Sequence, residues 1–187
     1  MKFISYDSIE KIETETEIRN ADADTIRDFS LTWDPYVDEK ILREKDRNFN
    51  YRIFEWDRII LMSLNVKFDD RCFAAYTGAR LDGLLSLRHQ KNFYLDFFAT
   101  APWNYFGTGG RMRRIGSGLV YFTIKNSMSL GMDGEFFLYA LKDAEKYCEM
   151  IGMVHTGSFK FGLEKFHMPK DRAAMFERGF RKYIIEN

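Results

Sequence analysis

The sequence predicts an α+β fold in which strands pair mostly as antiparallel hairpins and helices pack against them. Three strand-like runs with short turns between them occupy residues 72–77, 84–89 and 93–100. Segments with helix caps and apolar spacing come before and after these strands, at about 22–31 and 119–130. The chain has 187 residues, of which 45% are hydrophobic, so it can bury the core of one domain.

The N-terminal third carries a possible strand and several helical segments. A strand from Lys2 to Tyr6 is followed by an acidic, threonine-rich stretch that we expect to be an exposed strand or loop. Trp33-Asp34-Pro35 predicts the end of the first helix, because the residue before a proline avoids the helical region. A second helix is expected from about Val37 to Lys45. Residues 50–65 predict a helix packed on the sheet, with a strand as the alternative for 58–66.

The C-terminal half is predicted to mix helices and strands. Pro102 ends the third strand, because proline cannot donate to a ladder. The glycine-containing stretch 105–112 is a loop, either a lid or a plain solvated connection. Beyond the helix at 119–130 we expect, in order, strand 135–141, helix 144–151, strand 153–159, an irregular stretch 160–170, helix 172–178 and strand 180–185.

The turn Arg113-Arg114-Ile115-Gly116-Ser117-Gly118 is the strongest functional signal. It lies between a strand-like run and a helix, and the first N–H groups of a helix have no intrahelical partner and attract anions. Glycines let a ligand approach the backbone, and arginines suit phosphate groups. The pattern therefore predicts a phosphate cradle; the alternative is an ordinary glycine-containing turn with two solvated arginines.

Composition excludes several classes of function. Lysines and arginines number 28, as do aspartates and glutamates, so no bulk positive field attracts nucleic acid or an anionic membrane. Cys72 and Cys148 lie far apart, and the three histidines show no metal-ligand spacing with them, so we expect no metal site. The cysteine usage favours a reducing compartment, and no run approaches the ~20 apolar residues that span a bilayer. We expect a cytoplasmic protein.

The spacing of Arg113, Gly116 and Gly118 resembles the pyrophosphate-binding motif of the GCN5-related N-acetyltransferases, the GNAT superfamily. The order of elements from residue 71 to residue 153 is also similar to the core of that family. Thr100-Ala101-Pro102 stands where the family often ends the strand before the motif, although the connection from Pro102 to Arg113 is longer here.

The resemblance implies a three-layer α/β arrangement with a mixed, mostly antiparallel central sheet flanked by helices. It implies one domain, 1–187, in which 1–69 form the acceptor side and 70–187 form the core sheet and cofactor site. The implied cofactor is acetyl-CoA or another acyl-CoA. In that family the strand before the motif, here Phe93 to Thr100, splays from the next strand, here 135–141. The backbone of the first of these two strands would pair with the pantetheine. The implied cofactor-binding residues are Phe98, Ala99 and Thr100 for pantetheine, and Arg113, Arg114, Ile115, Gly116, Ser117, Gly118 and Leu119 for pyrophosphate.

The candidate catalytic residues lie on the two strands that would diverge and on the helix that follows them. Asp96 is the only ionisable residue in its apolar strand, so it is the first candidate for a general base, and Glu135 is the second. Cys148 stands where the family commonly has a tyrosine general acid, and a thiol can donate a proton to a leaving thiolate. The alternatives are an Asp96 on the solvent face and a Cys148 that only packs in a helix. Tyr147 is one position away and is the weaker candidate.

The sequence thus favours an N-acetyltransferase that acylates an amine of a small molecule or a protein. The first alternative is an acyl-CoA-binding module without catalysis. The second is a nucleic-acid-associated protein that would use its basic and aromatic residues, namely Arg111, Arg113, Arg114, Trp103, Tyr105 and Phe106. Aromatic residues between 160 and 185 would suit a homodimer.

Overall fold

The computed structural model describes residues 1–43, 56–64, 70–105, 111–160 and 162–186. Its centre is a nine-stranded sheet with the order β6-β1-β2-β3-β4-β5-β7-β9-β8. The strands are β1 (Lys2–Asp7), β2 (Ile12–Asn20), β3 (Asp70–Thr77), β4 (Arg80–His89), β5 (Phe93–Thr100), β6 (Met112–Arg113), β7 (Phe136–Ala140), β8 (Val154–Lys160) and β9 (Leu163–Met168).

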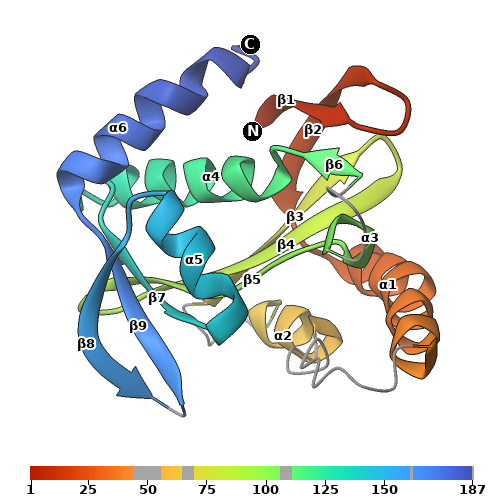
Figure 1. Ribbon diagram of the computed structural model, residues 1–187, viewed down its shortest axis with the longest axis horizontal. Helices are drawn as coiled ribbons and strands as arrows, with labels where there is room; N and C mark the ends of the chain where they lie inside the picture. The colour runs from red at the N-terminus through yellow and green to blue at the C-terminus, as the bar shows by residue number, and fades with distance from the viewer. Residues whose placement is uncertain (44–55, 65–69, 106–110, 161, 187) are drawn as a thin grey trace.

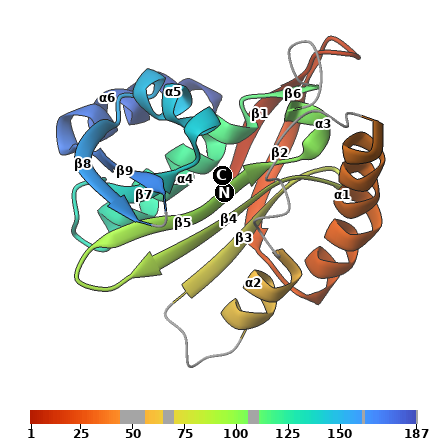
Figure 2. The same cartoon turned by 60° about the horizontal axis from the view of Figure 1, so that its bottom comes forward.

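Helices cover both faces of this sheet, which gives the predicted three layers (Figures 1 and 2). One face carries α1 (Ala23–Arg43), α2 (Trp56–Ser63) and the short α3 (Pro102–Tyr105). The other carries α4 (Ile115–Ser129), α5 (Lys142–Met150) and α6 (Lys170–Phe180), after which comes the short 3₁₀ helix η2 (Arg181–Tyr183). No helix within the described ranges is both long and apolar enough to cross a membrane.

Each pair of layers encloses its own apolar core, because successive side chains of a strand point to opposite faces. The core under α4, α5 and α6 is built around fully buried Leu119, Phe136 and Phe166. The core under α1 to α3 is built around Trp33 and Ile60. The indole N–H of Trp33 donates to the Leu81 carbonyl at 2.9 Å, so this ring is satisfied as well as buried.

The predicted divergence of two strands is present between β5 and β7. Every other strand pair is antiparallel, whereas these two are parallel and share only the register pair Tyr94 and Phe137. A β-bulge precedes the divergence: Leu87 faces Leu95 and Ser86 faces Phe97, which leaves Asp96 without an opposite residue. The bulge bends β5 where it leaves β7, so the sheet opens at Asp96.

The predicted helix break at Pro35 is wrong. Helix α1 runs through Pro35 to Arg43 as one element. Proline removes one helical hydrogen bond, but the buried Trp33, two residues earlier, anchors the helix on the sheet through Leu81. The described part of residues 50–65 is the helix α2, not the strand considered as an alternative.

The C-terminal end also differs from its prediction. The stretch expected to be irregular, 160–170, contains β9, which pairs with both β7 and β8. The expected last strand, 180–185, is the end of α6, the turn of η2 and a single bridge between Phe3 and Ile184. The loop predicted at 105–112 lies largely outside the described residues.

Candidate functional site

Helix α4 begins with an uncapped end that presents backbone donors. Arg114 adopts a left-handed conformation with φ of 74° and makes no side-chain cap hydrogen bond. The Gly118 N–H donates to the Arg114 carbonyl at 2.8 Å. The N–H groups of Ile115, Gly116 and Ser117 therefore lie ahead of the helical ladder, where an anion is favoured.

The two glycines of the turn have different structural roles. A Cβ on Gly116 would lie 3.2 Å from the Tyr147 hydroxyl and 3.5 Å from the Phe98 ring. A Cβ on Gly118 would lie 2.4 Å from the ring of the buried Phe3, which no real side chain tolerates. Gly116 thus borders the site, whereas Gly118 lets α4 pack closely on β1. The sequence motif alone assigned both glycines to the ligand.

The two arginines of the turn also differ. A nitrogen of the Arg114 guanidinium is 2.9 Å from a Glu13 carboxylate oxygen, and the group lies 4.1 Å from the centre of the Tyr183 ring. Arg113 is exposed, and within the described residues it has no carboxylate partner. Arg113 is therefore available to an incoming anion, whereas Arg114 already balances Glu13.

A cavity of about 70 Å³ lies where β5 and β7 diverge, next to α5. Phe98 and Tyr147 line it from the helix side, and their rings stack at 6.2 Å with 18° between their planes. Asp96 and Tyr139 line it from the other side of the sheet, because they alternate with residues that pack under the helices. The cavity therefore connects the two faces through the opening between the strands.

Tyr147 places a polar atom in this apolar cavity. Its hydroxyl is buried and, among the described residues, makes no hydrogen bond. Burial raises the pKa of Tyr147 to about 12, and the nearby Ser117 hydroxyl opposes part of that shift. A buried hydroxyl without a partner is costly, so this atom is suited to contact a ligand in the cavity.

Cys148 also lines the cavity, but it belongs to the core. Only 4% of its surface is exposed, and burial raises the pKa of the thiol to about 12. Its neighbours include the buried chains under α4 and α5, which fits the alternative of a packing cysteine.

The two carboxylates proposed from the sequence are both paired. Asp96 receives two guanidinium bonds from Arg88, one of them 2.8 Å long, and it is the only carboxylate among the described cavity-lining residues. Glu135 lies 3.3 Å from His167, just before β7 and outside the cavity lining. The structure therefore brings Asp96 and Cys148 to one cavity but leaves Glu135 outside its lining.

The basic and aromatic residues that suggested nucleic-acid binding are largely engaged within the protein. The guanidinium of Arg111 is 3.0 Å from the Asp7 carboxylate, and the Trp103 indole donates to Asp82 at 3.1 Å. With Arg114 paired to Glu13, Arg113 is the remaining exposed arginine of this group. Phe106 lies outside the described residues.

Comparison with known proteins gives matches in structure but not in sequence. No family model matches the sequence, and no curated protein matches it. The PaiA N-acetyltransferase from Thermoplasma acidophilum, in complex with coenzyme A, is 14% identical with a TM-score of 0.55, covering 81% of this chain and 97% of that one. A GNAT-family acetyltransferase from Listeria monocytogenes is 13% identical with a TM-score of 0.55, covering 82% of this chain and 94% of that one.

A third solved structure is a spermidine N-acetyltransferase chimera of Vibrio cholerae SpeG and human sequence. It is 14% identical, with a TM-score of 0.53, and the match covers 85% of this chain and 98% of the other. The chain has the GNAT fold. The sequence resemblance to this family is thereby confirmed at the level of the fold.

The sequence ranked Tyr147 below Cys148 as a candidate acid. The family pattern aligned Cys148 with the tyrosine position, and a shift of one residue turns a helical side chain by about 100°. In the structure it is the ring of Tyr147 that stacks on Phe98, a contact between distant segments that the sequence does not show. Among the described residues, no group of His, Cys, Asp or Glu is arranged to hold a metal ion.

Proposed function

We propose that the protein transfers an acyl group from acetyl-CoA, or another acyl-CoA, to an amine. The observation that carries this proposal is that the uncapped start of α4 and the opening between β5 and β7 meet at one place, between Gly116, Phe98 and Tyr147. A ligand with a phosphate end and an extended amide-bearing arm fits these two features. The coenzyme A bound to the similar Thermoplasma enzyme supports the same cofactor.

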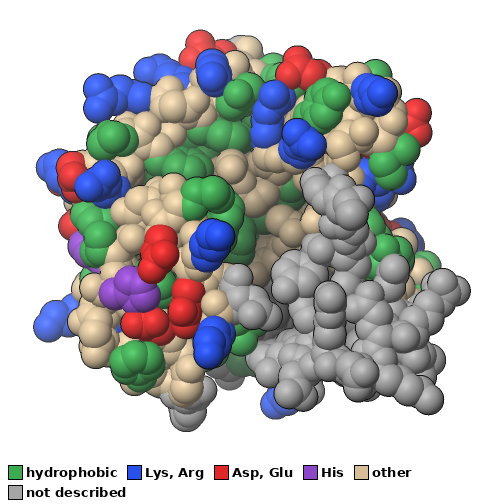
Figure 3. Space-filling model, in the orientation of Figure 1, with side chains coloured by type: hydrophobic (Ala, Val, Ile, Leu, Met, Phe, Trp, Pro, Cys, Tyr) green, Lys and Arg blue, Asp and Glu red, His purple; other side chains and the backbone are tan. Residues whose placement is uncertain are grey.

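The pyrophosphate would bind the N–H groups at the start of α4, from Ile115 to Leu119, with Arg113 as its charged partner. Figure 3 shows basic side chains along the upper edge of the molecule, over α6 and the start of α4. Lys182 is exposed and lies over the ring of Tyr183, which also contacts Arg114. This field favours a ligand that carries several phosphates.

The pantetheine arm would enter between the diverging strands. Beyond Tyr94, β5 has no register partner on β7. Phe98 and Ala99 pair with β4 along one edge of β5, and the other edge borders the opening. An extended ligand can pair with such an edge as an added strand does. In this structure Phe98 and Tyr147 occupy much of the opening, so we expect their stacked rings to separate when the arm binds.

The chemical step needs few groups. The amine nitrogen would attack the thioester carbonyl carbon and give up its proton to solvent water, and the carbon–sulfur bond would break so that the sulfur leaves as a thiolate that takes up a proton. We assign the last proton to the Tyr147 hydroxyl, because its raised pKa keeps it protonated at neutral pH and its oxygen is unpaired in the cavity. Cys148 is the second candidate.

Asp96 remains the first candidate for contact with the acceptor amine, but the role that we propose for it is not that of a general base. Each of its oxygens already accepts a hydrogen bond from Arg88. We infer that Asp96 acts mainly by holding Arg88 at the opening. Catalysis then rests largely on positioning the amine against the thioester.

The experiment that tests the proposed function is a calorimetric titration of acetyl-CoA into wild-type protein and the Gly116→Glu variant. A carboxylate placed at the start of α4 repels phosphate, so we expect wild-type binding and none in the variant. Ser129→Glu is the matched control, because Ser129 is exposed and lies at the opposite end of α4. Equal affinity of all three proteins for acetyl-CoA would show that the cofactor does not bind at the start of α4.

The non-catalytic module keeps one observation in its favour, since the only described carboxylate that lines the cavity is already paired. Release of free coenzyme A in the presence of a panel of amines separates the two functions. Turnover with any amine supports the enzyme, and cofactor binding without turnover across the panel supports the module.

A further inference from the structure

An aromatic platform lies on the face of the sheet opposite α4 and α5, beside the cavity. It consists of the half-buried rings of Tyr94 on β5, Phe137 on β7 and His167 on β9. The Tyr94 and Phe137 rings are 5.7 Å apart, and Phe137 stacks on His167 at 4.6 Å with 16° between the planes. Tyr94 and Phe137 are also the register pair after which β5 and β7 diverge.

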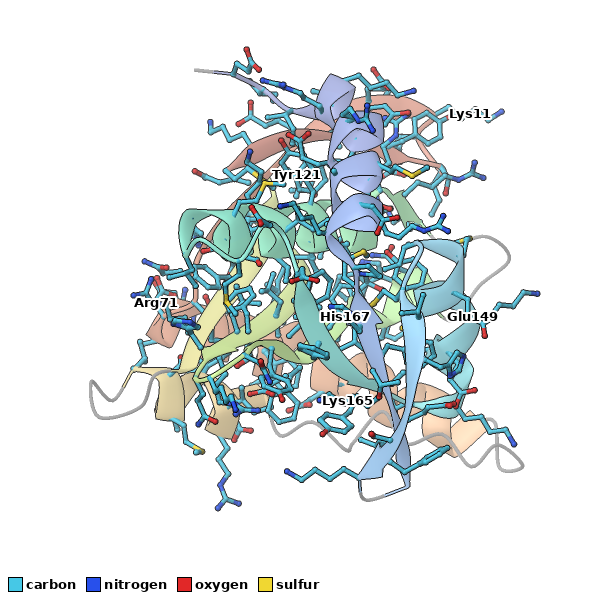
Figure 4. All side chains as sticks on the ribbon, turned by 90° about the vertical axis from the view of Figure 1, so that its left-hand side faces the viewer. Lys11, Arg71, Tyr121, Glu149, Lys165 and His167 are labelled. Atoms are coloured by element: carbon cyan, nitrogen blue, oxygen red, sulfur yellow. The ribbon has the colours of Figure 1, made fainter. Side chains whose placement is uncertain are left out.

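Lys165 lies on this platform, and within the described ranges no carboxylate pairs with it. Its ammonium nitrogen is 4.3 Å from the centre of the Phe137 ring and 5.4 Å from that of Tyr94. Glu164 precedes Lys165 in β9 and Glu135 precedes β7, but each carboxylate has another partner: Glu164 is 2.6 Å from His155, and Glu135 is 3.3 Å from His167. Among the described residues, none provides a carboxylate to Lys165 (Figure 4 shows it with His167 on β9).

The platform adjoins the opening through which the acceptor must approach. Lys165 faces Tyr139 in the register of β7 and β9, and Tyr139 lines the cavity together with Asp96. On the other side, the Arg88 guanidinium lies 4.7 Å above the Tyr94 ring. Asp96 neutralises Arg88, so among the described residues Lys165 is the positive charge at this mouth of the cavity that has no carboxylate partner.

The pKa of Tyr94 reflects the positive charges around it. The neighbouring Asn92 side chain lowers the pKa of Tyr94, burial opposes this, and the positive charges of Lys165 and Arg88 lower the pKa further. A cation that is already held over two rings loses less side-chain freedom when it pairs with an anion than a free lysine does. The same charge repels a second ammonium group on the acceptor.

We propose that Lys165 binds a carboxylate of the acceptor, so that the substrate is a small amino carboxylic acid rather than a polyamine. This inference rests on the proposed function, because it names the acceptor of the same site. The aromatic platform would contact the carbon chain between the amine and the carboxylate. A polyamine would place its second ammonium against Lys165 and bind poorly.

The test uses three conjugates in which coenzyme A is joined through an acetyl linker to the nitrogen of an acceptor. The acceptors are an ω-amino acid, its carboxamide and a diamine of the same length, each prepared over a short series of chain lengths. Calorimetry measures their binding, and that of coenzyme A alone, to wild-type protein and to Lys165→Met. Lys125→Met, on the opposite face of the sheet and near Glu177, is the matched control.

We expect the carboxylate conjugate of the best chain length to bind about tenfold more tightly than the carboxamide, with the diamine weakest. Lys165→Met should remove this preference and leave coenzyme A binding unchanged, and Lys125→Met should keep both. Equal affinities, or a preference for the diamine, at every chain length in wild type would overturn the inference while the cofactor site stands. Failure of coenzyme A itself to bind would overturn the proposed function, and the inference with it.

Discussion

At the residue scale, two neighbouring residues on α5 have different environments, and single substitutions can distinguish their roles. Tyr147 carries the unpaired hydroxyl in the cavity, whereas Cys148 packs in the core. We expect Tyr147→Phe to lower kcat by about 100-fold or more, because loss of a general acid typically costs that much. Cys148→Ala should change kcat little. The measurement is steady-state release of coenzyme A from acetyl-CoA with a saturating amine.

The pH dependence provides an independent check of the same assignment. Burial raises the pKa of Tyr147 to about 12, and a phenol is protonated below its pKa. Wild-type kcat should therefore show no alkaline loss from this acid between about pH 7 and about pH 10. A loss of kcat in this range would contradict the assignment, because neither Tyr147 nor Cys148, whose thiol pKa burial also raises to about 12, would lose its proton there.

Gly118 allows the second prediction at this scale, because its role is packing. A methyl group at this position would meet the Phe3 ring at 2.4 Å. Gly118→Ala should lower the free energy of unfolding by about 1–3 kcal/mol, the usual cost of overpacking. Combining it with Phe3→Leu should recover part of that loss, and urea unfolding of the four proteins gives the coupling energy. Simple additivity of the two losses would show that α4 does not need this close approach.

At the element scale, the start of α4 depends on β6, and β6 depends on Asp7. This buried carboxylate accepts from the guanidinium of Arg111 at 3.0 Å and from the N–H groups of Ile9 and Glu10. Burial would raise the pKa of Asp7, but the two backbone donors and Arg111 lower it overall. The stabilisation is therefore present above the ordinary carboxylate pKa of 3.8 and is lost as the pH falls below it.

We accordingly expect Asp7→Asn to lower the free energy of unfolding at neutral pH by about 1–3 kcal/mol. The affinity for acetyl-CoA should also fall, because Arg111 and β6 lead directly into the turn at Arg114. Denaturation by urea and calorimetric titration measure the two effects. Asp133→Asn is the control, since Asp133 is exposed and paired only with the exposed Lys170. If both variants had the same free energy of unfolding and the same affinity for acetyl-CoA, Asp7 would have no role in positioning the turn at Arg114.

The elements that the sequence predicted well are those fixed by local chemistry. The strand ended by Pro102 and the glycine turn before α4 depend on backbone groups that nearby residues control. The elements it missed depend on distant contacts. Helix α1 survives Pro35 because Trp33 packs on β4, and β9 forms because two other strands pair with it.

The site divides in the same way. The turn from Arg113 to Gly118 was visible in the sequence, but the separate roles of its two glycines required the position of Phe3. The pairing of Asp96 with Arg88 spans two strands and a bulge. The aromatic platform under Lys165 is built from three strands that are far apart in the chain, so no local sequence pattern predicts it.

At the scale of the whole molecule, the sheet separates two tasks. The face under α4 and α5 carries the donors and the polar hydroxyl that suit a cofactor, and the opposite face carries Lys165 on its aromatic platform. The opening at the Asp96 bulge is where the two faces communicate. Under the proposed function, the acyl donor and the acceptor would approach one another through the sheet without competing for the same surface.

Each of the two cores also contains a buried cysteine thiol, and these thiols predict how the stability of the protein changes at alkaline pH. Burial raises the pKa of the thiols of Cys72 and Cys148 from 9.0 to about 12, and Cys72 lies in the core under α1 to α3. Between these values the unfolded chain has released protons that the folded chain keeps. The free energy of unfolding should therefore be insensitive to these groups below about pH 9 and fall as the pH rises towards 12.

The expected slope is about 1.4 kcal/mol per pH unit for each thiol. We expect the variant Cys72→Ala/Cys148→Ala to be less stable than wild type at about pH 8, because it loses two packed side chains. Its stability should nevertheless fall less between about pH 8 and about pH 10. Urea unfolding of both proteins at the two pH values measures the difference. Parallel losses would mean that other groups, such as Tyr147, drive the alkaline unfolding, since its pKa is also raised.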